Sequence, residues 1–165
     1  MSDQPLAYFI TFRTYGTWLH GDDRGATDRR NRSWGEPHLT PDSERRNIAY
    51  SRLARPPVTF TPDHRRIVEA ECHNQCVRRD WTLHAINART EHVHLVVSAD
   101  VPPERVMTAL KAGSTSALRA RGLWADKQGP WSRHGGTRYL WKESDVEAAC
   151  LYVTEMQDTP KEVQR

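Results

Sequence analysis

Two histidines, His92 and His94, stand one residue apart in the run EHVHLVV, whose composition is typical of a buried β-strand. Side chains of a strand alternate between its faces, so both imidazoles point the same way and lie about 7 Å apart along the strand. Val93, Leu95 and Val97 point the opposite way, into a core. Two imidazoles on one face can share a metal ion. The alternative is a pair of partly exposed histidines on the surface of a sheet.

Tyr152 is the second residue whose type could do chemistry. It belongs to an expected helix that begins with Ser144 as N-cap and Glu147 three residues later, a capping box, and fades before Pro160. Tyr152 lies about 100° around this helix from Val153, which faces the sheet. The phenol therefore occupies a flank position from which it could reach over the sheet edge. The alternative is a boundary tyrosine with a hydrated hydroxyl.

The elements that must position these residues follow from hydrophobic periodicity and from the places of proline and glycine. The expected order is strand 7–15, helix 62–79, strands 81–87 and 92–98, helix 103–121, loop 129–136, strand 137–141 and the terminal helix. Within 81–87, Leu83 and Ala85 are expected on one face. The order predicts an α+β fold: a ferredoxin-like (split βαβ) antiparallel sheet with helices on one face and a C-terminal helix carrying the tyrosine.

Length and composition bound the class of protein. The 165 residues predict a single domain, 1–165, with a long loop-rich insertion at about 16–61 that contains a short helix over 41–53. No apolar run approaches the about 18 residues of a membrane span, and no basic-then-apolar leader opens the chain. Three cysteines make no disulfide framework, so a cytoplasmic location is expected. Cys72, Cys76 and Cys150 are expected in core packing rather than in a zinc site.

The basic residues are mostly arginine: 24 Lys and Arg less four lysines leaves 20 arginines, with a net charge of +3. The planar guanidinium suits phosphate recognition and stacking on bases. A GC-rich genome, in which arginine replaces lysine throughout, accounts for the same bias. Six tryptophans and several Arg-Arg pairs favour a nucleic-acid partner.

Taken together, these blocks resemble the single-tyrosine HUH transposases, most closely the REP-associated tyrosine transposases and their insertion-sequence relatives. The resemblance rests on four stretches: the opening YFITFRTYGTWLHGDDRG, the central EHVHLVVSAD, the later GGTRYLW, and YVTEMQ near the end. It implies a metal-dependent single-stranded DNA endonuclease and strand transferase. Such an enzyme forms a 5′-phosphotyrosine intermediate at hairpin or repeat DNA and uses Mg²⁺ or Mn²⁺.

Carried over by residue, the resemblance makes His92 and His94 the metal-binding pair and Tyr152 the nucleophile. The family's third ligand is an amide or other polar side chain about one helical turn after the tyrosine, but position 156 is Met. Either the helix loosens at its end, or Gln157 reaches in from the inner face, or Glu155 substitutes; Gln157 is favoured. The sequence leaves open a homodimer in which Tyr152 meets the histidines of a second subunit.

A tyrosine nucleophile implies single-stranded or hairpin DNA, which basic grooves and aromatic stacking hold. The candidate DNA-binding residues are Arg13, Tyr15, Trp18, Lys111, Arg133 and Arg138. Lys111 and the run Ser114–Ser116 are expected on the outer face of helix 103–121. An alternative function is a domesticated, catalytically silent protein that binds DNA hairpins. An RNA-binding sheet of the same topology is disfavoured, because it would need exposed aromatics where the two histidines stand.

Overall fold

The computed structural model describes residues 3–17 and 51–156, and its elements follow the expected order along the chain. They are the strands β1 (Ala7–Thr14), β2 (Thr82–Ala88), β3 (His92–Ser98) and β4 (Trp131–Leu140), the helices α2 (Pro62–Arg78), α3 (Pro103–Ala120) and α4 (Glu143–Leu151), and a π-helix, η1 (Tyr152–Met156). The predicted helix 41–53 and the predicted insertion 16–61 lie mostly outside the described residues.

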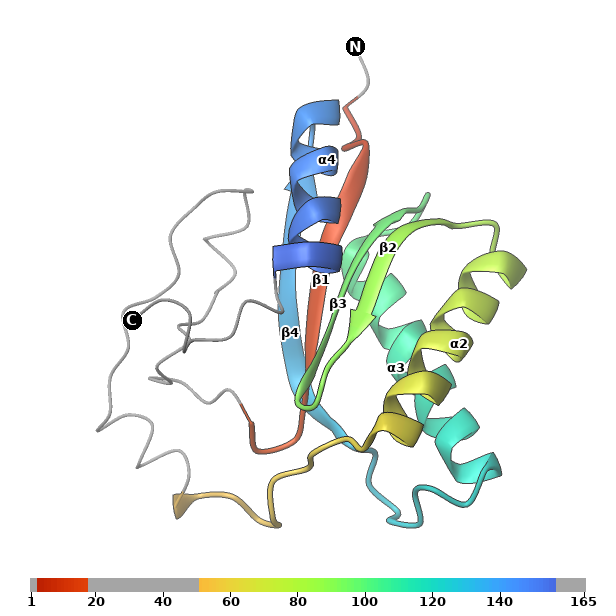
Figure 1. The fold of residues 1–165 in the computed structure, drawn as a ribbon, viewed down its shortest axis with the longest axis vertical. Coiled ribbons are helices and arrows are strands. Elements are labelled where there is room, and N and C mark those ends of the chain that lie inside the picture. The colour runs from red at the N-terminus through yellow and green to blue at the C-terminus, as the bar shows by residue number, and fades with distance from the viewer. Residues whose placement is uncertain (1–2, 18–50, 157–165) are drawn as a thin grey trace.

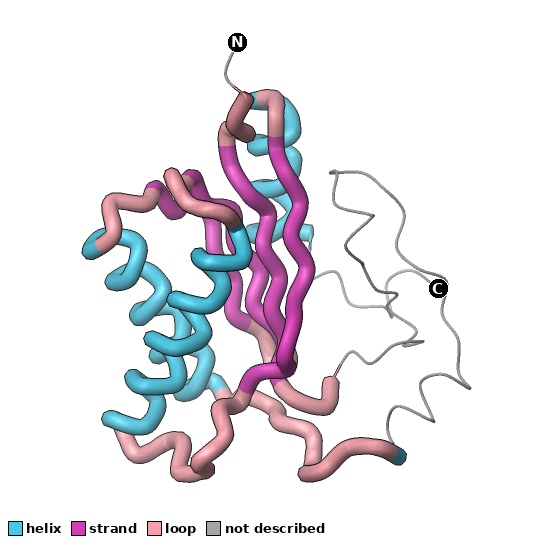
Figure 2. The backbone as a smooth tube through the Cα atoms, turned by 180° about the vertical axis from the view of Figure 1, so that it is seen from behind, coloured by secondary structure: helices cyan, strands magenta, loops and turns pink. Residues whose placement is uncertain are grey.

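The four strands form one sheet in the order β2-β3-β1-β4, and every neighbouring pair is antiparallel. Since β3 lies between β1 and β2, and β1 lies between β3 and β4, the two strand–helix–strand units interleave. This is the ferredoxin-like arrangement that the sequence predicts. Helices α2 and α3 cover one face of the sheet, and α4 with η1 lies on the opposite face (Figure 1). The view from behind shows α2 and α3 side by side on their face (Figure 2).

A hydrophobic cluster lies on each face of the sheet. The larger cluster packs the sheet against α2 and α3 and includes Ile10 and Leu95. The smaller one packs the sheet against α4 and η1 and includes Phe9, Val96 and Val153. Both faces of the two central strands, β1 and β3, are therefore buried. Each fully buried aliphatic side chain contributes roughly 1.5–3 kcal/mol, so these two strands form a rigid base for the residues they carry.

Strand β2 contains an irregularity that the sequence did not predict. Its pairing with β3 shifts between Leu83, which pairs with Val97, and Ala85, which pairs with Val96. Leu83 packs in the α2/α3 cluster, whereas Ala85 belongs to the α4 cluster. The expected placement of Leu83 and Ala85 on one face was therefore wrong, because a bulge adds one residue and reverses the alternation that follows it.

Strand β4 begins earlier than predicted. The expected loop 129–136 is strand from Trp131 onward, because Gly135 and Gly136 pair with Phe12 and Thr11 of β1. A Cβ at Gly135 would meet the backbone oxygen of Thr11 and would lie 2.7 Å from Sδ of Met107. This glycine is therefore required by close packing against β1 and α3, not by a turn.

Helix α4 also begins differently from the prediction. Its N-cap is Lys142, which keeps an extended backbone with φ −120° and ψ 149°, and no side chain caps the first turn. The predicted capping box of Ser144 and Glu147 was wrong, since both residues lie inside the helix. The earlier start brings Glu143 and Asp145 into the first turn, where the helix dipole favours acidic side chains.

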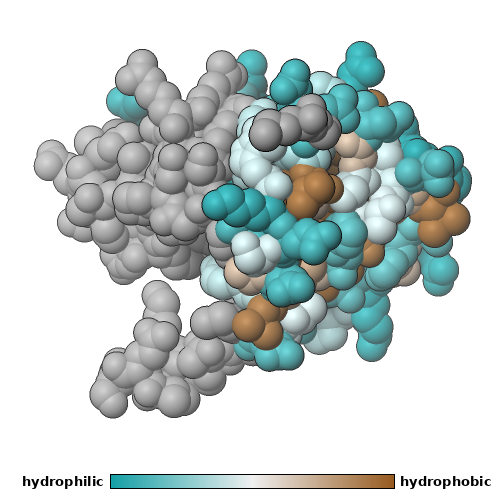
Figure 3. Space-filling model, turned by 90° about the horizontal axis from the view of Figure 1, so that it is seen from above, coloured by the Kyte–Doolittle hydropathy of each residue, from teal (hydrophilic) through white to brown (hydrophobic). Residues whose placement is uncertain are grey.

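The surface and the cysteines complete the description. Cys72 and Cys76 are buried in the core as predicted, and all three cysteines are free thiols. Viewed from above, hydrophilic residues cover most of the described surface and apolar residues form small separate patches (Figure 3). None of the helices in the described ranges has the length and apolar character needed to cross a bilayer.

We expect Gly135→Ala to lower the free energy of unfolding by about 1–3 kcal/mol, because the added methyl group overpacks the contact between β1 and α3. Urea denaturation measures this change. Gly129→Ala is the matched control: its Cβ would lie 3.4 Å from Oγ1 of Thr115, an ordinary contact. Equal stabilities of the two variants would contradict the close packing at Gly135.

Candidate functional site

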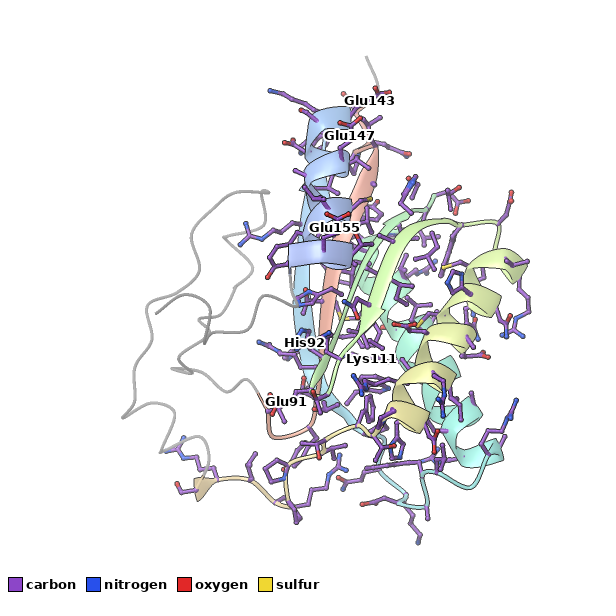
Figure 4. All side chains as sticks on the ribbon, viewed as in Figure 1. Glu91, His92, Lys111, Glu143, Glu147 and Glu155 are labelled. Carbon is purple, nitrogen blue, oxygen red and sulfur yellow. The ribbon has the colours of Figure 1, made fainter. Side chains whose placement is uncertain are left out.

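The two histidines lie on the face of the sheet that α4 and η1 cover. His92 and His94 project from β3, and the centroids of their imidazole rings are 4.3 Å apart with an interplanar angle of 73°. Figure 4 labels His92 at the sheet, below Glu155 of η1. The backbone alternation of β3 therefore brings the two rings together as the sequence predicts.

His94 is fixed in place by its neighbours on β1. The side chain is only 3% exposed. Its Nδ1 is 2.7 Å from Oγ1 of Thr11, the residue paired with it across the strands. Its ring stacks on Phe9, with centroids 5.5 Å apart and an angle of 16°. When the ring donates its Nδ1 hydrogen to the Thr11 hydroxyl, Nε2 keeps the lone pair that a metal ion requires.

The ring of Tyr152 packs against the rings of His94 and Phe9. Its ring meets His94 edge-on, with centroids 5.8 Å apart and an angle of 83°. It also meets Phe9 edge-on at 5.9 Å. Edge-to-face aromatic pairs are worth about 0.5–1.5 kcal/mol beyond their buried area. The phenol thus lies beside a histidine of its own chain, and the geometry needs no second subunit to bring them together.

The electrostatic surroundings of the phenol pull in two directions. Burial raises the pKa of Tyr152 above its ordinary value, and the positive charge of Arg138 partly opposes this rise. Arg138 belongs to β4, is paired with Phe9 and is only 5% exposed. Its guanidinium is thus a buried cation whose field favours the ionised form of the phenol.

The helix that carries Tyr152 changes type at that residue. Residues 152–156 form a π-helix, in which hydrogen bonds join residues five apart instead of four. A loosened helix end was one of the three alternatives for the third ligand, and the described turn has this character. Gln157, five residues after Tyr152, lies outside the described residues. Its role as a ligand stays a prediction.

Glu155 does not complete a metal site in this arrangement. It is exposed on η1. Within residues 3–17 and 51–156, no three or more His, Cys, Asp or Glu side chains gather closely enough to hold one metal ion. Among the described residues, the two histidines therefore stand without a third side chain of these four types close enough to share a metal ion.

Two polar residues beside His94 were not singled out from the sequence. Thr11 of β1 and Asn87 of β2 are its partners in the strand pairing on either side. The alternation of β1 places Thr11 on the same face as Phe9, which is a signal that the sequence contains. The position of Asn87 depends on the β2 bulge, which left no recognisable signal.

The predicted DNA-binding residues divide between the two faces. Arg13 is paired with His92, and Arg138 is buried near Tyr152. Tyr15 is engaged within the protein: the Arg55 guanidinium lies 4.1 Å from the ring centroid, and its hydroxyl accepts a hydrogen bond from Ala54 N. Trp18 lies outside the described residues.

Lys111 and Arg133 line a groove on the α3 side of the sheet, away from Tyr152. The groove has a volume of about 520 Å³, and its lining includes four basic residues and no acidic one. The basic residues are Lys111, Arg119, Lys127 and Arg133. Figure 4 shows Lys111 on the side of α2 and α3. The groove therefore has the charge and hydroxyl-rich lining that suit a phosphate backbone.

Hydrogen bonds within the protein hold part of the lining of this groove in place. Lys111 Nζ donates to the backbone oxygens of Ser132, at 3.0 Å, and of His134, at 3.4 Å. Burial, with the charge of Arg13 adding to the effect, lowers the pKa of Lys111 to about 8. The expected outer-face position was wrong for Ser114 and Thr115, which are buried, whereas Ser116 is exposed as expected.

Comparison with known families identifies the class of this protein. The model of the family described as "Transposase IS200 like" matches residues 52–146, which is more than half of the chain. The chain therefore belongs to the IS200-like transposase family, a family of DNA-processing proteins. The matched stretch contains both histidines and ends before Tyr152.

Two solved structures are similar to this chain. One is a protein described as a transposase of Deinococcus radiodurans R1, with 10% identity and a TM-score of 0.47; the match covers 89% of this chain and 88% of that one. The other is a REP-associated tyrosine transposase bound to a REP hairpin, with 12% identity and a TM-score of 0.47, covering 93% and 70%. No curated protein matches the chain.

We expect Arg138→Gln to raise the pKa of Tyr152 further, because the substitution removes the cation that opposes the effect of burial. Absorbance titration of the phenol at alkaline pH measures this shift, with the matching Tyr152→Phe protein subtracted as background. Lys142→Gln, which removes an exposed cation, is the control. An unchanged or lower pKa in Arg138→Gln would show that another group sets the field at the phenol.

Proposed function

We propose that this protein is a metal-dependent endonuclease and strand transferase that cleaves single-stranded DNA at hairpin or repeat sequences through a 5′-phosphotyrosine at Tyr152. The observation that carries the proposal is the edge-on packing of the Tyr152 ring against His94, which in turn neighbours His92. A nucleophile and two metal-binding side chains thus share one face of one sheet.

The donor set fits a divalent cation. His92 and His94 would hold Mg²⁺ or Mn²⁺, with Gln157 as the proposed third ligand. Oxygen ligands suit these ions, and an amide oxygen with the phosphate oxygens of DNA would supply them beside the two imidazoles. A bound cation would polarise the scissile phosphate and stabilise the charge that develops on it. The Thr11 hydroxyl would keep the His94 ring in one orientation.

The chemistry of the chain's own residues follows from their positions. Oη of Tyr152 attacks the phosphorus, a bond forms between them, and the bond from phosphorus to the 3′ oxygen breaks. The 3′ oxygen leaves and becomes a free hydroxyl by taking a proton, while the phenol gives up its own. Arg138 favours the loss of the phenol's proton and offers a positive charge to the phosphate. The phosphotyrosine bond conserves the phosphodiester for rejoining, so no nucleotide cofactor is needed.

The groove on the α3 side would bind the DNA backbone. Its basic and hydroxyl side chains match phosphates, and Trp131 is not available there for stacking because its ring packs edge-on against Phe12 and Phe60. A cytoplasmic location is part of the proposal, and a homodimer is one of its two alternatives for the assembly. The contact between Tyr152 and His94 within one chain is compatible with a monomer as well.

We expect wild-type protein, incubated with Mn²⁺ and a labelled hairpin oligonucleotide, to form a covalent adduct that survives SDS. Tyr152→Phe removes the attacking oxygen, so it should abolish the adduct and leave DNA affinity within a few-fold. His94→Ala should abolish metal-dependent cleavage as well, since it removes one of the two imidazoles. Gel electrophoresis of the labelled DNA measures both.

The outcomes separate the proposal from its rivals. An adduct in Tyr152→Phe would assign the nucleophile elsewhere, and unchanged nicking by His94→Ala would move the metal site. Wild-type protein that binds the hairpin tightly but forms no adduct with either metal would favour the catalytically silent hairpin-binding protein.

We expect Lys127→Gln/Arg133→Gln to weaken DNA binding and to flatten its salt dependence. The magnitude of the slope of log K against log salt should fall by roughly 1.4–1.8, about 0.7 per lost phosphate contact on a single strand and about 0.9 on a duplex stem. Both side chains line the groove and are exposed. Fluorescence anisotropy at several salt concentrations measures this. Arg66→Gln/Arg78→Gln removes the same charge from α2, outside the groove. An equal loss of DNA affinity in this control would mean that net charge, and not the groove, accounts for the effect.

A further inference from the structure

We propose that Asn87 is a positioning residue that fixes the π-helical turn η1 on the sheet, so that the Tyr152 phenol lies against His94. The inference rests on the proposed function of that pair. Its starting point is one hydrogen bond: Nδ2 of Asn87 donates to the backbone oxygen of Val153, 3.0 Å away. This bond joins β2 to the residue that directly follows Tyr152.

Val153 is the point at which η1 is anchored. Its side chain is fully buried in the cluster under α4, next to Phe9 and Val96. Carbonyl groups in the last turn of a helix lack the full set of partners that interior ones have. A side-chain donor from the sheet therefore satisfies a backbone oxygen at the place where the helix changes from α to π. The core holds the side chain of Val153, and Asn87 holds its backbone oxygen. The adjacent Tyr152 therefore has little freedom to move relative to the sheet.

Asn87 reaches this oxygen because of the β2 bulge. The shift between Leu83 and Ala85 turns Asn87 toward the α4 face and pairs it with His94. Without the shift, the strand pairing would bring Asn87 opposite Val93, whose side chain belongs to the α2/α3 core. Asn87 is thus a neighbour of His94 and is also hydrogen-bonded to η1, the turn that carries Tyr152.

This double attachment sets the geometry between nucleophile and histidine. Asn has only two side-chain torsions, so its hydrogen bond holds η1 in a nearly fixed position relative to β2. A displacement of about 1 Å between reacting groups can cost about 100-fold in rate. The Phe9 contact alone would let the phenol slide across the ring. The hydrogen bond to Val153 fixes the position of the phenol along the helix axis, which the edge-on contact with Phe9 does not.

The test compares two substitutions of Asn87. Asn87→Ala removes the donor, and we expect it to slow single-turnover adduct formation about 10-fold or more at saturating DNA and Mn²⁺. DNA affinity should stay within two-fold. Asn87→Gln keeps an amide donor, and we expect it to recover most of the lost rate. Asn74→Ala, the same change at an exposed position of α2, is the control and should behave as wild type.

A second measurement does not depend on cleavage. Hydrogen exchange of the backbone amides over 148–156 should be faster in Asn87→Ala than in wild type, with α2 unchanged. Wild-type adduct rate in Asn87→Ala, or an equal slowing in Asn87→Gln, would overturn the proposal. If wild-type protein forms no adduct at all, the proposed function fails and the exchange data alone decide: unchanged protection over 148–156 would then overturn the positioning role.

Discussion

The ring of Phe9 is the contact on which the arrangement of the site depends. It stacks on His94 and meets Tyr152 edge-on, so one apolar side chain of a central strand contacts both proposed reactive groups, which come from different elements. The approach of α4 to the sheet is close because Ala7 and Ala149, both buried there, have short side chains. Packing in this small cluster therefore sets the positions of the imidazole and the phenol relative to each other.

The same burial affects the ionisation of the Tyr152 phenol. A phenol within an apolar cluster holds its proton more firmly than one in water, which opposes its use as a nucleophile. Arg138 is the described residue whose charge counters this effect. Burial and Arg138 therefore act on the pKa of the phenol in opposite directions, and burial has the larger effect.

Much of the fold could be predicted from local patterns. The alternation of β3 placed His92 and His94 on one face, and helical periodicity located α2 and α3 within a residue or two. Two of the failures have a common cause. The strand at Gly135 is held by pairing with β1, and the facing of Asn87 is set by a shift against β3. Both depend on a partner strand distant in sequence, so no local pattern reports them. The change to a π-helix at Tyr152 likewise accompanies contacts with the sheet.

The polar residues of the α4 face show what this surface is organised to do. Thr11, His94 and Asn87 are neighbours in three adjacent strands, beside the apolar cluster that packs α4 and η1 on the sheet. Polar groups at such positions cost stability unless they are hydrogen-bonded, and a methyl or isopropyl group would pack there at least as well. Thr11 instead bonds His94, and Asn87 bonds the backbone of η1. The two hydrogen bonds orient the histidine and the tyrosine's helix separately. These three polar residues are better explained by a need to orient the histidine and the tyrosine's helix than by a need to stabilise the fold.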